Sequence, residues 1–257
     1  WIVLICAATL VTIAMGIRQS FGLFLRPIQQ DIGVDSAAFG LAIAVQNLIL
    51  GLAQPVVGAL ADRMGAGRVA AAGGALYALG LALTAGVSGA LGLNLTLGVL
   101  VGFAMTGVTF VIAIGAAVRA VPVEKRGLAA GIVTAGGSVG QFLLVPIAQG
   151  LIGGFGWRET MLIYAALAAT MVLLAIGIAG KPRAAQTTGT DPQGMGPALL
   201  EAMRHSGFWL LNAGVFVCGF HVAFIATHLP TFLADKGLDP TVGARALALV
   251  GLFNILG

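Results

Sequence analysis

The chain has 257 residues, of which 59% are hydrophobic and only 9% are charged. A soluble domain usually carries roughly a quarter charged residues, so this chain has too few polar side chains to cover a water-soluble surface. The composition excludes a cytosolic enzyme and a secreted disulfide-stabilised domain. It also excludes a nucleic-acid-binding protein, because most of the 13 Lys and Arg residues behind the net charge of +4 lie between apolar segments.

Eight apolar runs follow one another along the chain. Each is long enough, at roughly 20 residues, to cross a bilayer as a helix. Pro27 and the stretch with Asp31, Gly33 and Asp35 are expected to close the first span, and Ser36 is expected to cap the second. The sequence therefore predicts an all-α polytopic membrane protein with spans near 1–25, 37–61, 69–88, 93–118, 128–154, 158–180, 207–233 and 242–257.

The segment 181–206 is the longest polar stretch, and it contains one short helical pattern around 199–204. It is predicted to be a cytoplasmic linker between an N-terminal six-helix bundle at 1–180 and the first two helices of a second bundle at 207–257. Trp1 is not an initiator Met and Gly257 lies within an apolar run. The chain is therefore expected to be a fragment, truncated in span eight.

The loops between the spans carry unequal numbers of cations. The loops after spans two, four and six hold eight, namely Arg63, Arg68, Arg119, Lys125, Arg126, Lys181, Arg183 and Arg204. The loops after spans one, five and seven hold three, namely Arg26, Arg158 and Lys236. Because short loops rich in Lys and Arg stay in the cytoplasm, we expect a multi-pass protein of the inner (plasma) membrane with a cytoplasmic N-terminus.

Spans one and seven are related by an internal repeat. A shift of 203 places Gly16, Arg18, Phe21 and Pro27 on Gly219, His221, Phe224 and Pro230. One inserted residue later, the segment DIGVD at 31–35 aligns with DKGLD at 235–239. Two parallel halves joined by a polar linker are the plan of one large class of transporters.

The loop between spans two and three carries a recognisable signature. Residues 58–68 read GALADRMGAGR, and the signature positions are Gly58, Asp62, Arg63, Gly65 and Arg68. This segment resembles the G-x-L-x-D-R-x-G-x-[RK]-R motif of the major facilitator superfamily, with one extra residue near its end. The resemblance implies the major-facilitator fold. Asp62 and the arginines are expected to form a charge cluster that is made and broken as the halves rock, and Gly58 is expected to let a neighbouring helix approach.

Two further segments resemble the monocarboxylate-transporter branch of that superfamily and its bacterial members. They are KRGLAAG at 125–131, which leads into span five, and GIRQSFG at 16–22, followed by Pro27. The resemblance implies a secondary transporter, not an enzyme, that moves a small organic anion, a monocarboxylate, by alternating access. It implies no cofactor. The expected partners are the anion, a proton as the candidate coupling ion, and the bilayer, and the protein is expected to be monomeric.

Two departures from the family bear on coupling. Span four lacks the arginine of many proton-coupled facilitators, and Gln141 stands where the antiporter motif of span five has Pro. Two other functions stay open: efflux of amphipathic compounds, with Arg18 paired to an acid elsewhere, and a non-transporting membrane sensor or scaffold.

Arg18 is the outstanding polar residue within a span. It lies eight residues before Pro27, or about 12 Å from the end of the helix. A cation at that depth is costly and usually faces a cavity or an anion, although snorkelling is the alternative. The repeat places His221 at the same depth in span seven. The expected substrate-binding residues are Arg18, His221, Asn47 and Gln141.

His228 and Arg245 lie nearer the outer surface and are expected to act as an outer gate. Cys218 and His221 are separated by two residues, a spacing seen in metal sites, but no carboxylate lies near them in the sequence. We therefore expect no metal site.

Overall fold

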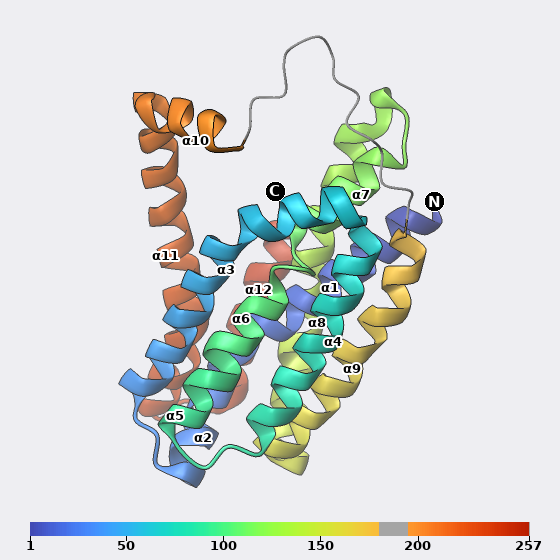
Figure 1. Ribbon diagram of the computed structural model, residues 1–257. Helices are drawn as coiled ribbons and strands as arrows, with labels where there is room; N and C mark the ends of the chain where they lie inside the picture. The colour runs from blue at the N-terminus through green and yellow to red at the C-terminus, as the bar shows by residue number, and fades with distance from the viewer. Residues whose placement is uncertain (180–194, 257) are drawn as a thin grey trace.

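The computed structural model describes residues 1–179 and 195–256, and within those ranges the chain forms helices and no strands (Figure 1). In chain order the elements are α1 (Ile2–Gln19), the 3₁₀ turn η1 (Phe21–Phe24), α2 (Leu25–Ile32), α3 (Ser36–Met64), α4 (Ala66–Ala85), α5 (Ala90–Leu93), the π-helical segment η2 (Asn94–Leu100), α6 (Val101–Met105), α7 (Phe110–Arg119), the 3₁₀ turn η3 (Val123–Lys125), α8 (Arg126–Phe155), α9 (Trp157–Ile178), α10 (Met195–Arg204), α11 (Ser206–Asp235) and α12 (Pro240–Leu256).

Seven helical spans in the described ranges are long and apolar enough to cross a membrane, and α12 is a shorter apolar helix of 17 residues. The predicted all-α membrane fold is confirmed. The N-terminal half of the predicted linker, including Lys181 and Arg183, lies outside the described residues. Its remainder forms α10, which is longer than the short helical pattern in the sequence indicated.

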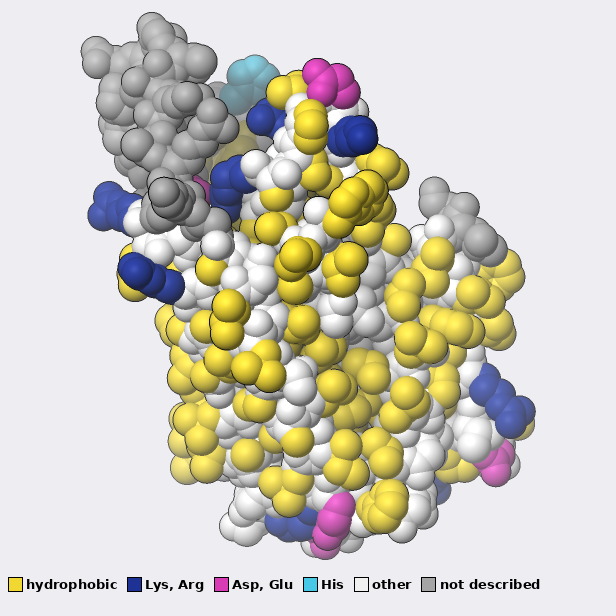
Figure 2. All heavy atoms as spheres, turned by 90° about the vertical axis from the view of Figure 1, so that its right-hand side faces the viewer, with side chains coloured by type: hydrophobic (Ala, Val, Ile, Leu, Met, Phe, Trp, Pro, Cys, Tyr) yellow, Lys and Arg dark blue, Asp and Glu magenta, His cyan; other side chains and the backbone are white. Residues whose placement is uncertain are grey.

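Charged side chains gather at the two ends of the bundle, and a broad hydrophobic band lies between them (Figure 2). One end carries Asp62, Arg119 and α10, and we refer to it as the Asp62 end. The other carries Asp31 and Arg158, and we refer to it as the Asp31 end. The band is the surface that faces lipid in a membrane protein.

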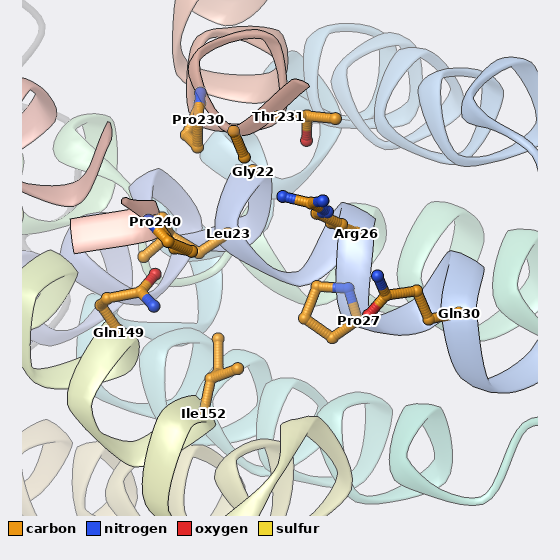
Figure 3. A pocket seen from close by; sticks show the side chains of 11 residues that line it. Gly22, Leu23, Arg26, Pro27, Gln30, Gln149, Ile152, Pro230, Thr231 and Pro240 are labelled. Carbon is orange, nitrogen blue, oxygen red and sulfur yellow. The ribbon is translucent and has the colours of Figure 1, made fainter. Parts of the chain in front are cut away.

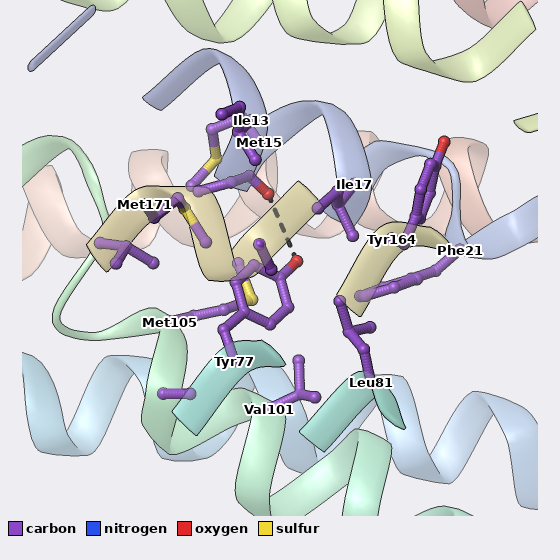
Figure 4. Close-up of a cluster of buried hydrophobic side chains, with 14 of the residues drawn as sticks. Ile13, Met15, Ile17, Phe21, Tyr77, Leu81, Val101, Met105, Tyr164 and Met171 are labelled. Carbon is purple, nitrogen blue, oxygen red and sulfur yellow. Dashed lines mark hydrogen bonds between the residues drawn. The ribbon is translucent and has the colours of Figure 1, made fainter. Parts of the chain in front are cut away.

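The helices of the N-terminal half pack closely because small residues line their contacts. A Cβ atom on Gly16 of α1 would lie 2.6 Å from the carbonyl oxygen of Gly140 on α8, so a larger side chain would push these helices apart. The core beside them is filled by large side chains (Figure 4). Within it the Tyr77 hydroxyl donates to the Ala14 carbonyl at 3.4 Å, which satisfies a buried polar group.

Span one is longer than the sequence indicated. The chain passes from α1 through η1 into α2, so Pro27 lies in the first turn of α2, where a proline costs no helical hydrogen bond. The span ends at Gly33, whose φ of 69° is the left-handed conformation that glycine favours. Asp35, and not Ser36, caps α3 by accepting from the Ala38 amide at 2.7 Å.

The second copy of this turn has the same construction, which explains the repeated sequence pattern. Gly237 follows α11 with φ 83°, and Asp239 accepts from the Thr241 amide at 2.8 Å in the first turn of α12. Hydrogen bonds from the side chain and the backbone amide of Thr241 lower the pKa of the Asp239 carboxyl. In both copies the glycine ends one span and the second aspartate begins the next.

Span four is interrupted, although its sequence predicts one continuous helix. Between α6 and α7 the helix stops and restarts, which leaves backbone groups without helical partners. Gln54 of α3 bonds both sides of the break: its amide donates to the Thr106 carbonyl at 3.5 Å, and its oxygen accepts from the Thr109 hydroxyl at 3.2 Å. Such support from a neighbouring helix is what makes an irregular backbone tolerable at membrane depth.

Candidate functional site

The two halves of the chain meet at the Asp31 end and separate toward the Asp62 end. Near the Asp31 end, α11 packs on η1, and the α11 residues that become buried are Ala226, Thr227, Pro230 and Ala234. Residues 209–222, in the half of α11 nearer the Asp62 end, are all exposed. In Figure 1, α11 runs beside α2 and the start of α3 at the bottom and away from α3 at the top.

Arg18 lies near the midpoint of the long first span, deeper than the position of Pro27 implied. Its guanidinium donates to the Asn47 side-chain oxygen on α3, so two of the expected binding residues are in contact. Both line a small cavity closed on its far side by Ala223, Ala226 and Thr227 of α11. Its volume of about 20 Å³ is roughly the room that one water molecule needs.

Gln46 is a residue of this cavity that sequence reasoning did not select. Its side chain is 1% exposed, and its Nε2 has no hydrogen-bond partner among the described residues. A buried donor without a partner costs about 1–3 kcal/mol, so Gln46 is a candidate donor to an anion in this cavity. The sequence signal was its position beside Asn47, but many amides in this chain occupy similar positions.

Gln141 lies in a neighbouring position, where the two halves are joined. Its oxygen accepts from the Gln19 amide at 3.1 Å, and its Nε2 donates to the Leu247 carbonyl of α12 at 2.9 Å. Gln19 also lines the Arg18 cavity, so a chain of polar groups runs from the cavity to the α8–α12 contact. Gln141 itself does not line the cavity.

The structure does not bring His221 to Arg18. Its side chain is exposed on α11, and its Nδ1 lies 2.9 Å from the Val217 carbonyl of its own helix. The residue of α11 that lines the Arg18 cavity is Ala223, two residues after His221. The role of His221 opposite Arg18 stays a prediction.

The signature loop lies at the Asp62 end. Gly65 turns the chain from α3 into α4 with φ 94°, a conformation that explains the glycine. Asp62 pairs with Arg119 of α7 at 3.5 Å, whereas Arg63 and Arg68 are exposed and form no ion pair among the described residues. The helix contact expected at Gly58 is not formed in this structure, because no atom lies within 4 Å of a Cβ placed there.

The expected outer gate residues lie on different helices, His228 on α11 and Arg245 on α12. His228 is half-buried, 3.9 Å from a Cβ placed on Gly40 of α3, and Arg245 is exposed on α12. A tighter contact lies at Gly22, where a Cβ would overlap the Ala226 carbonyl oxygen of α11. Gly22 lines both the Arg18 cavity and a larger one at the Asp31 end, so this backbone contact separates the two.

A polar cluster ties three helix ends together at the Asp31 end. The Asp31 carboxylate accepts from the indole of Trp157 and from the Nε of Arg158, each at 3.0 Å. The same guanidinium donates to the carbonyls of Ala85 and Val87 at 2.7 and 3.2 Å. The ends of α2 and α4 are thereby joined to the start of α9. In the part of the chain that the structure describes, His, Cys, Asp and Glu form no group that could hold a metal ion.

A lipid-facing helical bundle with a half-buried arginine between two repeat-related spans defines a polytopic membrane protein of the transporter type. A sequence profile described as the Major Facilitator Superfamily matches residues 4–257, and the chain belongs to that family.

The chain is also similar to individual transporters. It is 29% identical over 261 residues to monocarboxylate transporter 11 of Homo sapiens, covering 98% of this chain and 53% of that one. It is 25% identical over 258 residues to the oxalate:formate antiporter of Oxalobacter formigenes, covering 99% of this chain and 60% of that one. The chain thus spans a little over half the length of these relatives.

The fold resembles a solved structure as well. A crystal structure of a bacterial homologue of the human lysosomal transporter Spinster, in an inward-facing and unoccupied conformation, matches with a TM-score of 0.74 at 20% identity. The match covers 97% of this chain and 59% of that one. At this identity the likeness confirms the major-facilitator fold and carries no information on substrate.

Proposed function

We propose that this protein moves a small organic anion, a monocarboxylate, across the membrane by alternating access, with Arg18 as the ligand of the carboxylate. The observation that carries the proposal is the Arg18 cavity. There a guanidinium near mid-membrane faces amides from α3 and no carboxylate among the described residues. A cation at this depth needs an anionic partner, and a carboxylate accepts two parallel hydrogen bonds from one guanidinium.

The arrangement of the halves supports alternating access. The Arg18 cavity has room for about one water molecule and is bounded on one side by α11, so a carboxylate fits only when α11 moves away. The gap between the halves widens toward the Asp62 end. We assign that end to the cytoplasm from the charge count, so the conformation seen here is closed to the outside and widens inward. The names of two relatives, a monocarboxylate transporter and an oxalate:formate antiporter, agree with this substrate class.

Uptake of labelled carboxylates by the full-length protein in proteoliposomes tests the proposal. Arg18→Lys keeps the charge but loses the paired hydrogen bonds, so we expect transport to fall about 10- to 100-fold, as the loss of a charge-assisted hydrogen bond implies. Arg204→Lys, on the exposed surface of α10, is the matched control and should transport normally. Carboxylate transport by Arg18→Lys at the wild-type rate and affinity would refute the ligand role and favour efflux, in which Arg18 pairs with an acid.

A further inference from the structure

A cavity larger than the one at Arg18 also lies between the two halves. It lies at the Asp31 end, where α2, α8, α11 and α12 converge, and it has a volume of about 230 Å³. Four polar side chains line it, those of Arg26, Gln30, Gln149 and Thr231 (Figure 3). The rest of its wall is apolar and includes three prolines, Pro27, Pro230 and Pro240.

Arg26 gives this cavity a positive charge. Its guanidinium extends from α2 toward Thr231 on the opposite half (Figure 3), and Arg26 forms no ion pair among the described residues. The acid closest to it in sequence, Asp31, is engaged by Trp157 and Arg158. Asp235 and Asp239 are exposed and do not line the cavity.

The cavity is also placed in series with the Arg18 cavity. Gly22 lines both, and its backbone contact with Ala226 is the barrier between them. Arg26 follows Arg18 by eight residues in the same span, which corresponds to about 12 Å along a helix. An anion leaving one guanidinium would meet the other once the barrier opened.

We propose that the Arg26 cavity is a second anion site, a vestibule that holds a small carboxylate on the outer side before it passes Gly22. The guanidinium supplies the charge, and the amides of Gln30 and Gln149 and the hydroxyl of Thr231 supply further donors. This inference rests on the proposed function for its cargo, but the charge selectivity of the cavity can be measured without any transport.

The first experiment measures that selectivity by cysteine chemistry. Gln149→Cys is introduced into full-length protein carrying Cys6→Ser and Cys218→Ser, and its reaction rates with an anionic and a cationic methanethiosulfonate reagent are compared. We expect the anionic reagent to be favoured, and Arg26→Gln to lower the ratio of the two rates about tenfold, within the range of electrostatic steering. Ser88→Cys, exposed outside the cavity, should show no dependence on Arg26. An unchanged ratio at position 149 overturns the proposal.

A second arm separates a dissolved anion from a lipid headgroup. The same rates are measured in liposomes of phosphatidylcholine alone and with added phosphatidylglycerol. We expect equal ratios in both, and protection of Gln149→Cys by millimolar lactate or oxalate. A ratio that collapses when phosphatidylglycerol is present would mean that Arg26 holds a lipid phosphate, and the vestibule for a dissolved carboxylate would be wrong.

The third arm uses transport in sealed vesicles. Arg26→Gln is expected to raise the KM for substrate added at the Asp31 end about 3- to 10-fold and to leave the KM at the other end unchanged, whereas Arg26→Lys retains most of the affinity. An equal rise at both ends would place Arg26 in the transport step itself and overturn the vestibule. If the wild type carries no carboxylate while the cysteine rates still depend on Arg26, the proposed function fails and the anion site stands.

Discussion

At Gly22 the first and seventh spans meet backbone to backbone. A Cβ atom there would overlap the Ala226 carbonyl oxygen, and the Thr227 carbonyl oxygen would lie 2.9 Å away. Backbone atoms cannot move aside as a flexible side chain can. Any larger residue must therefore separate η1 from α11, and it would do so at the contact that closes the Arg18 cavity toward the Asp31 end.

Gly22→Val is accordingly expected to hold the barrier open. Overpacking a close contact costs about 1–3 kcal/mol, which corresponds to a shift of about 5- to 150-fold in the ratio of open to closed forms. The readout is the labelling rate of Ala223→Cys, which lines the Arg18 cavity, by a membrane-impermeant maleimide added at the Asp31 end. We expect about tenfold faster labelling than in the parent protein.

The matched control is Gly51→Val, because a Cβ on Gly51 meets no atom within 4 Å. That variant should label at the parent rate. Equal labelling of Gly22→Val and Gly51→Val would show that the Gly22 contact does not close the cavity.

The sequence located part of the site at this scale. Arg18 and Asn47 could be selected because a cation or amide in an apolar run is costly without a partner, and the two are in contact. Gln46 and Arg119 were not singled out, because Gln46 was one of several amides in the spans and Arg119 one of several arginines in the loops. The missing hydrogen bond of Gln46 depends on the packing around it, and the pairing of Arg119 with Asp62 joins α7 to α3, a contact that no local spacing encodes.

Among the elements, the ends of α2, α4 and α9 depend on one side chain. Arg158 bonds Asp31, Ala85 and Val87, and its guanidinium also lies 4.5 Å from the centre of the Trp157 ring. The carbonyls of Ala85 and Val87 lie at the end of α4, where helical donors run out. Loss of the Arg158 guanidinium would therefore leave these two backbone acceptors without a protein donor.

Arg158→Gln is expected to lower the free energy of unfolding by about 1–2 kcal/mol, a value kept low because the Arg158–Asp31 pair is partly exposed. Asp31→Asn should cost less, since Arg158 retains both carbonyl acceptors. Thermal unfolding in detergent measures both. Arg245→Gln, an exposed arginine without an ion pair among the described residues, serves as the control. A smaller effect for Arg158→Gln than for Asp31→Asn would contradict the role of the carbonyl bonds.

The number and order of the long helices could be predicted because the apolar runs are separated by polar turns. The interruption in span four was not predicted, although residues 106–109 (TGVT) are more polar than the segments on either side. Its stability comes from Gln54 on another helix. Span one was expected to be closed by Pro27 together with the stretch at 31–35; it ends at Gly33 of that stretch, whereas Pro27 lies in the first turn of α2, where a proline is tolerated.

The cations are unevenly distributed between the two ends of the molecule, and this predicts its orientation in the membrane. We expect the Asp62 end to face the cytoplasm, because the loops there hold most of the cations. In intact cells, Lys125→Cys and Glu201→Cys should resist a membrane-impermeant maleimide, whereas Ser88→Cys and Lys236→Cys should react. All four positions are exposed, so burial does not confuse the comparison. The reverse pattern of labelling would invert the topology.

The lone charge of Arg18 has an electrical consequence. An empty carrier of the proposed kind holds one positive charge near the membrane midpoint, whereas a carrier loaded with a monocarboxylate holds none there. Moving one elementary charge through a potential of 100 mV is worth about 2.3 kcal/mol. When access switches from one side to the other, the membrane voltage therefore acts on the unloaded protein and leaves the loaded one nearly unaffected. An inside-negative potential would draw the empty site toward the cytoplasm, so voltage would govern the return step of the cycle.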